Sequence, residues 1–149
     1  MISRVLSSFF MGFLFVGVLN FLFFVGLKLN YFDLYNIDVF FNVMFVDNQN
    51  FFILLPLSLL LGYLLMHSPF KTMAMKIYIV SILIFMTTFY EPIGKSIGEA
   101  IFLEENQKFK YGSTTFSGAT LYKGREDIFI YREELGKTIK LPMAETTVF

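Results

Sequence analysis

The stretch that decides the fold is VLSSFFMGFLFVGVLNFLFFVGL, residues 5–27, which holds no charged side chain. Arg4 precedes it and Lys28 follows it. Crossing the hydrocarbon core of a membrane takes about 20 apolar residues at about 1.5 Å each, so this stretch is long enough for one span. A cleaved signal peptide would have a shorter apolar run that ends at small residues, and no alanine occurs before Ala74. The stretch therefore predicts an uncleaved membrane anchor.

The composition of the whole chain agrees with a membrane protein. Of its 149 residues, 56% are hydrophobic and 16% are charged, whereas soluble domains have about 45–50% and about 25%. Twelve basic residues balance twelve acidic ones, so no net charge attracts nucleic acid. The absence of cysteine excludes disulfides and thiolate chemistry, and a single histidine excludes histidine-rich metal sites.

Two further apolar stretches, residues 51–66 and 73–90, predict a second and a third span joined by a short link. Pro56 lies inside the second stretch and is expected to kink the helix. We therefore predict an α-helical integral membrane protein with three transmembrane helices in residues 1–90, followed by a small C-terminal β-rich extramembrane domain.

The basic residues near the ends of the spans predict the orientation. Arg4, Lys71 and Lys76 lie on one side, and only Lys28 lies on the other. Basic residues favour the cytoplasmic side, so we expect a cytoplasmic N-terminus and an extracytoplasmic C-terminal domain. The abundance of Phe, Asn, Lys and Ile, with little Ala, resembles the products of AT-rich bacterial genomes. The expected location is the bacterial inner membrane.

Residues 30–50 are too polar to span and too apolar for a free loop. A span here would bury Asp33 and Asp38 at an appreciable cost, so we expect an element in the membrane interface. It is predicted to be helical at its start and extended over residues 39–46, which are rich in β-branched and aromatic side chains. Residues 47–50 are typical of a turn.

Residues 91–106 are predicted to form an amphipathic helix. A charged stripe and an apolar stripe, each with a spacing of four residues, run along the segment. The stripes consist of Glu91, Lys95 and Glu99, and of Ile93, Ile97 and Ile101.

Residues 107–149 show short β-prone segments separated by turn residues. The predicted strands are residues 109–111, 114–116, 119–122, 128–131 and 138–141, with breaks at 112–113, 117–118, 123–124 and 135–136. Residues 125–135 fit a helix as the alternative, although Ile-Phe-Ile-Tyr favours a strand. A piece this small rarely folds alone. We therefore expect it to pack on the 91–105 helix, on the 30–50 loop or on another chain.

The polar and small residues inside the spans are the candidate packing or pore-lining residues. Two pairs with small-x-x-x-small spacing predict close helix contacts, and the remaining polar side chains could line a pore if several copies assembled. The candidates are Ser8, Gly12, Asn20, Ser58, Gly62, Ser81 and Thr88.

No motif predicts catalysis, a metal or a cofactor. Gly94-Lys95-Ser96 matches the end of a phosphate-binding loop, but Phe89 stands where that motif needs its first glycine. No nucleotide and no nucleic acid are expected as partners.

The leading hypothesis is a non-enzymatic accessory, assembly or scaffold component of a larger membrane complex. Its partners would be membrane lipid and another membrane protein or a second copy of itself. The alternative hypothesis is a homo-oligomeric channel or small transporter lined by Asn20, Ser81 and Thr88.

Overall fold

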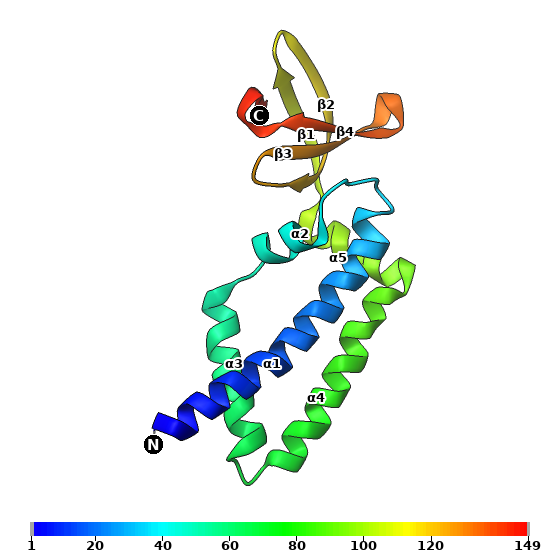
Figure 1. Ribbon diagram of the computed structural model, residues 1–149. Coiled ribbons are helices and arrows are strands. Elements are labelled where there is room, and N and C mark those ends of the chain that lie inside the picture. Colours follow the sequence, from blue (N-terminus) through cyan, green and yellow to red (C-terminus); the bar gives the residue numbers. More distant parts are fainter. Residues whose placement is uncertain (1, 149) are drawn as a thin grey trace.

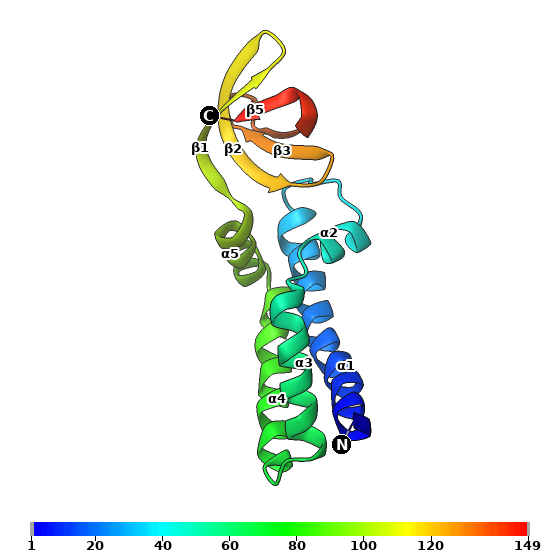
Figure 2. The same ribbon diagram turned by 90° about the vertical axis from the view of Figure 1, so that its left-hand side faces the viewer.

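The computed structural model describes residues 2–148. Long helices run side by side and carry a β-sheet at one end, and two shorter helices lie between these parts (Figures 1 and 2). The expectation of a helical part followed by a β-rich part is confirmed. The helical elements are α1 (Ile2–Leu27), the π-helix η1 (Lys28–Phe32), α2 (Phe41–Asp47), α3 (Phe51–Met66), α4 (Lys71–Met86), the 3-10 helix η2 (Thr87–Phe89) and α5 (Glu91–Phe102).

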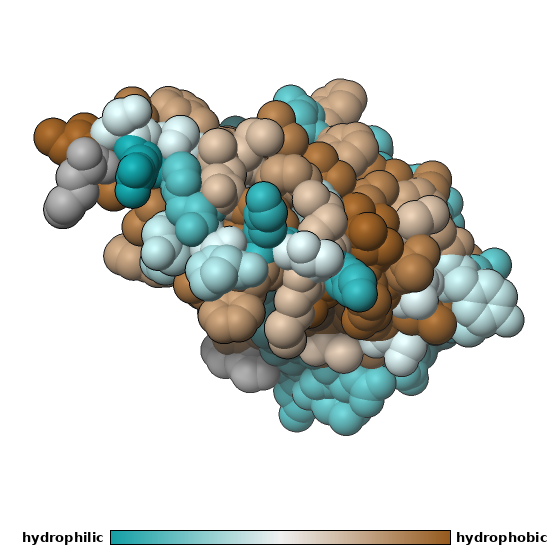
Figure 3. Space-filling view, turned by 90° about the horizontal axis from the view of Figure 1, so that it is seen from below, coloured by the Kyte–Doolittle hydropathy of each residue, from teal (hydrophilic) through white to brown (hydrophobic). Residues whose placement is uncertain are grey.

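Two helices are long and apolar enough to cross a membrane. One is the continuous helix Ile2–Phe32, of 31 residues, and the other is Lys71–Phe89, of 19 residues. The predicted second span is helical, but α3 alone has only 16 residues. It reaches the required length only together with α2, from which it is bent by 85°. Residues 2–148 therefore contain two candidate spans, or three if the bent pair counts as one. A view from the end that carries the N-terminus shows hydrophobic side chains over much of this surface (Figure 3).

The segment before α3 differs from its predicted form. It begins helically, as expected, but residues 41–47 form α2 and not an extended stretch. Met44 is fully buried, and Phe41 and Phe45 stack on each other and pack against the same core. This one-sided burial at helical spacing outweighs the β preference of the individual residues.

The amphipathic helix α5 begins at the predicted position with Pro92 in its first turn. It ends at Phe102, four residues earlier than expected, because Glu104 already starts the first strand. Lys95 and Glu99 of the predicted charged stripe form an ion pair between successive turns, with 3.8 Å between Nζ and Oε1.

The C-terminal part is an antiparallel half-barrel with strand order β4-β3-β2-β1-β5. Each predicted strand lies within an observed one, and two of the predicted breaks are hairpin turns at Gly112 and Gly136, both with positive φ. The strands are β1 (Glu104–Tyr111), β2 (Thr114–Lys123), β3 (Asp127–Arg132), β4 (Lys137–Pro142) and β5 (Thr146–Val148).

The predicted break at residues 117–118 is wrong, because β2 runs through it. Gly118 is needed there for close strand contact: a Cβ atom would lie 2.7 Å from the Tyr131 carbonyl oxygen. The strand β5 was not predicted. It has three residues and pairs with β1, so its sequence alone carries little signal.

One hydrophobic core joins the half-barrel to the helices, as the size of the β-rich part led us to expect. Its buried members come from α1, η1, the following loop, α2 and two strands. They are Phe24, Leu27, Tyr31, Phe32, Ile37, Met44, Leu121, Tyr122 and Phe129. By comparison, the separate cluster inside the half-barrel has only three buried members, namely Phe109, Ile128 and Ile130. The half-barrel therefore depends on the helices for much of its core.

Candidate functional site

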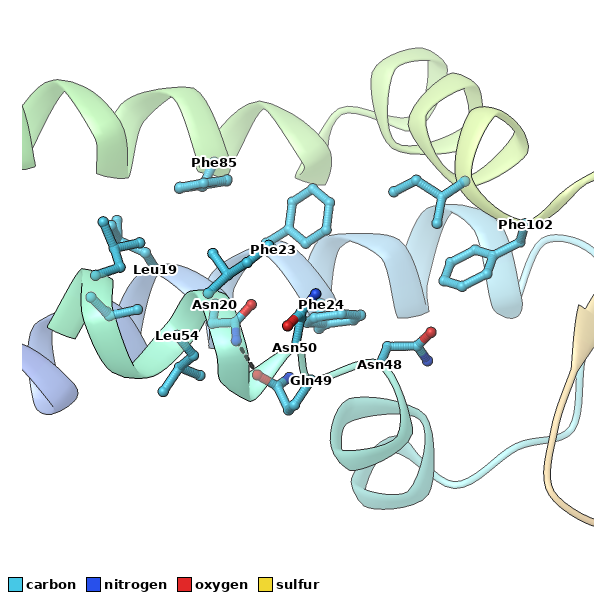
Figure 4. Close-up of a pocket in the computed structure, with 14 residues that line it drawn as sticks. Leu19, Asn20, Phe23, Phe24, Asn48, Gln49, Asn50, Leu54, Phe85 and Phe102 are labelled. Carbon is cyan, nitrogen blue, oxygen red and sulfur yellow. Dashed lines mark hydrogen bonds between the residues drawn. The ribbon is translucent and has the colours of Figure 1, made fainter.

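A cleft of about 630 Å³ lies between α1, α3 and α4, at the end of these helices nearest the half-barrel. Ile101 and Phe102 of α5 contribute to its wall, and so does the turn between α2 and α3. All fourteen residues that line it are uncharged, and most of them are apolar. Figure 4 shows carboxamides in the middle of the cleft, with Leu19 and Leu54 to one side and Phe85 of α4 across from them.

The cleft exists because α3 is short. Sixteen residues extend about 24 Å, which is less than the hydrocarbon thickness of about 30 Å. At Asn50 the chain leaves the helix axis by 85° and continues into α2, while α1 and α4 run on. The space beside these two helices is therefore not filled by a third one.

Carboxamide side chains form the polar part of the cleft. The Asn20 amide of α1 donates to Oε1 of Gln49 in the α2–α3 turn. The Gln49 amide in turn donates to the Phe45 carbonyl oxygen at 2.7 Å. An amide nitrogen carries two N–H groups, so Asn20 and Gln49 each keep one N–H beyond these bonds. The side chain of Asn50 makes no capping bond to α3. These groups can donate to a neutral acceptor placed in the cleft.

The four predicted packing residues meet at the crossing of α1 and α3. A Cβ atom on Gly12 would lie 1.7 Å from the Ser58 carbonyl oxygen, and one on Gly62 would lie 1.8 Å from the Ser8 carbonyl oxygen. The two pairs thus face each other reciprocally in antiparallel helices. Such close contact between two helix backbones requires small residues at the crossing.

The three predicted pore-lining residues lie in different surroundings. Asn20 faces the cleft. Thr88 is buried within the chain, where a Cβ on Gly26 would lie 1.9 Å from its hydroxyl oxygen. Ser81 donates to the Ile77 carbonyl oxygen of its own helix at 2.9 Å. These three residues do not line one common surface of a single chain.

A second, more polar cleft of about 610 Å³ lies between α5 and the half-barrel. In it the Tyr35 hydroxyl donates to Oε1 of Glu99 at 2.5 Å. Burial, together with this hydrogen bond, raises the pKa of Tyr35 to about 12. The hydroxyl is therefore protonated at neutral pH and acts as a donor that fastens the loop to α5, not as a base.

From the sequence, Gln49 is interpreted as part of a turn, and Asn50 as part of that turn or as the cap of the second span; Asn50 is the N-cap residue of α3, but its side chain makes no capping bond. One signal in the sequence could have pointed to their role. Asn20 is an isolated carboxamide in an apolar helix, so it needs a polar partner that lies at the same level along the helix. The sequence does not show which residues lie at that depth.

The fold and the cleft define a helical chain with membrane-spanning candidates and a half-barrel fixed to one end. The chain matches no family model, no curated protein and no solved structure.

Proposed function

We propose that this protein is a non-enzymatic accessory or scaffold component of a larger membrane complex in a bacterial inner membrane. The N-terminus would lie in the cytoplasm and the half-barrel outside. The observation that carries the proposal is the way in which the half-barrel is attached: it shares its core with the helices, and within residues 2–148 its sheet ends in two strands, β4 and β5, that each pair on one side only.

The attachment uses polar contacts as well as the shared core. The buried Tyr31 hydroxyl donates to the Leu121 carbonyl oxygen of β2 at 2.8 Å. The Thr138 hydroxyl of β4 donates to a carbonyl oxygen of the loop after η1, and Arg125 pairs with Asp47 of α2. These three contacts, to η1, to the loop after it and to α2, hold the half-barrel against the helices. A domain held at a fixed position suits a scaffold role better than a domain on a flexible tether.

The open edges supply a surface for a partner. The sheet ends at β4 on one side and at β5 on the other. Lysines on an edge strand discourage unspecific pairing, and β4 carries Lys137 and Lys140. The edge at β5 is Thr146-Thr147-Val148, which has no charge. We therefore expect a strand of the partner to add at β5, where main-chain hydrogen bonds would give affinity.

A photocrosslinking amino acid at Thr147, which is exposed on β5, tests this proposal in native membranes. The matched control is the same amino acid at Glu134, which is exposed in the turn before β4. The expected result is one discrete adduct with another membrane protein from Thr147 and none from Glu134. Equal adducts from both positions, or none from either, would contradict the proposal. An adduct with a second copy alone would favour the channel hypothesis, which ion flux in liposomes would then test.

A further inference from the structure

We propose that the cleft between α1, α3 and α4 binds one membrane glycerolipid. One acyl chain would lie along its apolar walls, and an ester carbonyl oxygen would accept hydrogen bonds from the carboxamides of Asn20, Gln49 and Asn50. This binding site does not depend on the proposed scaffold role.

The size and the lining of the cleft suit such a ligand. Its volume of about 630 Å³ lies within the range of about 300–1,000 Å³ that is typical of ligand pockets. Leucine and phenylalanine side chains from four helices form the walls, and a few polar groups lie together in the middle (Figure 4). Sites with this division bind molecules that have one polar end and a long apolar part.

The carboxamides lie close to the depth of a lipid ester. The apolar sequence of α3 begins at Phe51, directly after Gln49 and Asn50. Because α3 extends only about 24 Å of the hydrocarbon thickness of about 30 Å, these two residues lie about 6 Å inside the boundary of the apolar layer. A glycerolipid has its ester groups near this boundary, with its acyl chains on the apolar side, so an ester group that enters the cleft comes within reach of the carboxamides. From the carboxamides the cleft continues along α3 past Leu54 and Leu57.

The charges indicate which part of the lipid enters. Among the residues that the structure describes, no lysine, arginine or acid lines the cleft, and a buried anion without a cation is strongly disfavoured. A phosphate or a free carboxylate would therefore stay outside. An ester carbonyl is a neutral acceptor, and the spare amide N–H groups are neutral donors, so the two are complementary.

The backbone gives an independent reason for a polar ligand at this place. The turn between α2 and α3 interrupts the helix by an 85° bend next to an apolar stretch. Irregular backbone at membrane depth is tolerated where it is buried in protein or lines a cavity. Here the turn residues Asn48, Gln49 and Asn50 all line the cleft. The backbone N–H groups of Asn48 and Gln49 donate within the chain, so a bound ester would accept from the second N–H groups of the Asn20 and Gln49 carboxamides.

The test uses the full-length chain, delipidated in mild detergent and titrated with dioleoyl phosphatidylglycerol, with the bound mass read by native mass spectrometry. The wild type should bind one lipid per chain with saturation. Leu54→Trp places a large ring in the cleft and should weaken binding at least tenfold. Leu83→Trp is the matched control, because Leu83 is 61% exposed on α4 and lies outside the cleft. It should bind like the wild type.

Asn20→Leu keeps the number and branching of the side-chain heavy atoms but removes the donor, and it should weaken binding about fivefold or more. Thermal unfolding of each variant verifies that it folds, and Leu19→Trp replaces Leu54→Trp if the latter does not. The proposal is overturned if the wild type binds no lipid, if the two leucine-to-tryptophan variants bind equally well, or if many lipids bind without saturation. Displacement of the lipid by an added quinone would also overturn it, since the quinone would then be the preferred carbonyl ligand.

Discussion

The replacement of Gly12 by alanine tests the packing of α1 on α3. The added Cβ would lie 1.7 Å from the Ser58 carbonyl oxygen, whereas real Cβ atoms essentially never come within 3.0 Å of such a neighbour. The helices therefore have to separate by about 1.3 Å, the difference between these two distances. A gap of about 1 Å already removes up to half of the dispersion energy of an atom pair. Because the gap opens along the whole crossing of α1 and α3, we expect Gly12→Ala to lower the free energy of unfolding by about 2–3 kcal/mol, within the usual range for overpacking.

The matched control is Gly17→Ala in the same helix, because a Cβ on Gly17 meets nothing within 4 Å. Alanine favours helix by up to about 1 kcal/mol over glycine, so this variant should be as stable as the wild type or more stable. The measurement is the loss of helical circular dichroism as sodium dodecyl sulfate is added to mixed micelles. Gly62→Ala should lose as much stability as Gly12→Ala. The double variant should lose less stability than the sum of the two single losses, because one separation of the helices relieves both contacts. Equal stability of the Gly12 and Gly17 variants would refute the reasoning.

Three further predictions concern the half-barrel. Tyr31→Phe leaves the buried Leu121 carbonyl oxygen without its donor and should destabilise the full chain by about 1–2 kcal/mol in thermal unfolding, whereas Tyr111→Phe on the exposed hairpin should not. Hydrogen bonds from a lysine on β2 and a glutamine on β1 hold the pKa of Glu104 below its usual value, so their stabilisation is present at neutral pH and is lost as the pH falls through the folded-state pKa. The advantage of the wild type over Glu104→Gln should therefore shrink as the pH falls from neutral through the lowered pKa of Glu104, and it should stay below about 1 kcal/mol because the group is exposed. An advantage that grows toward acid would contradict this. Residues 91–149 expressed alone should show neither a cooperative transition nor dispersed amide resonances, because much of their core lies in the helices.

The sequence by itself determined the class of the fold. Apolar stretches of sufficient length predict helices because every backbone group must be satisfied within the segment. Alternating segments with glycine turns predict strands, and the positive φ at Gly112 and Gly136 shows why those glycines are needed. The small-x-x-x-small pairs on α1 and α3 were also visible. Each of these signals depends on local spacing, which a sequence displays directly.

Only the tertiary structure decided which surfaces meet. Residues 39–46 have β-prone side chains, but burial of Met44 against a core from distant segments makes part of them a helix. Asn20 and Gln49 are 29 positions apart and become partners because α3 is short and the chain turns away at its start. The cleft forms because α3 is too short to fill the space beside α1 and α4. Its physical cause is the relative length and direction of packed helices, which no local pattern in the sequence specifies.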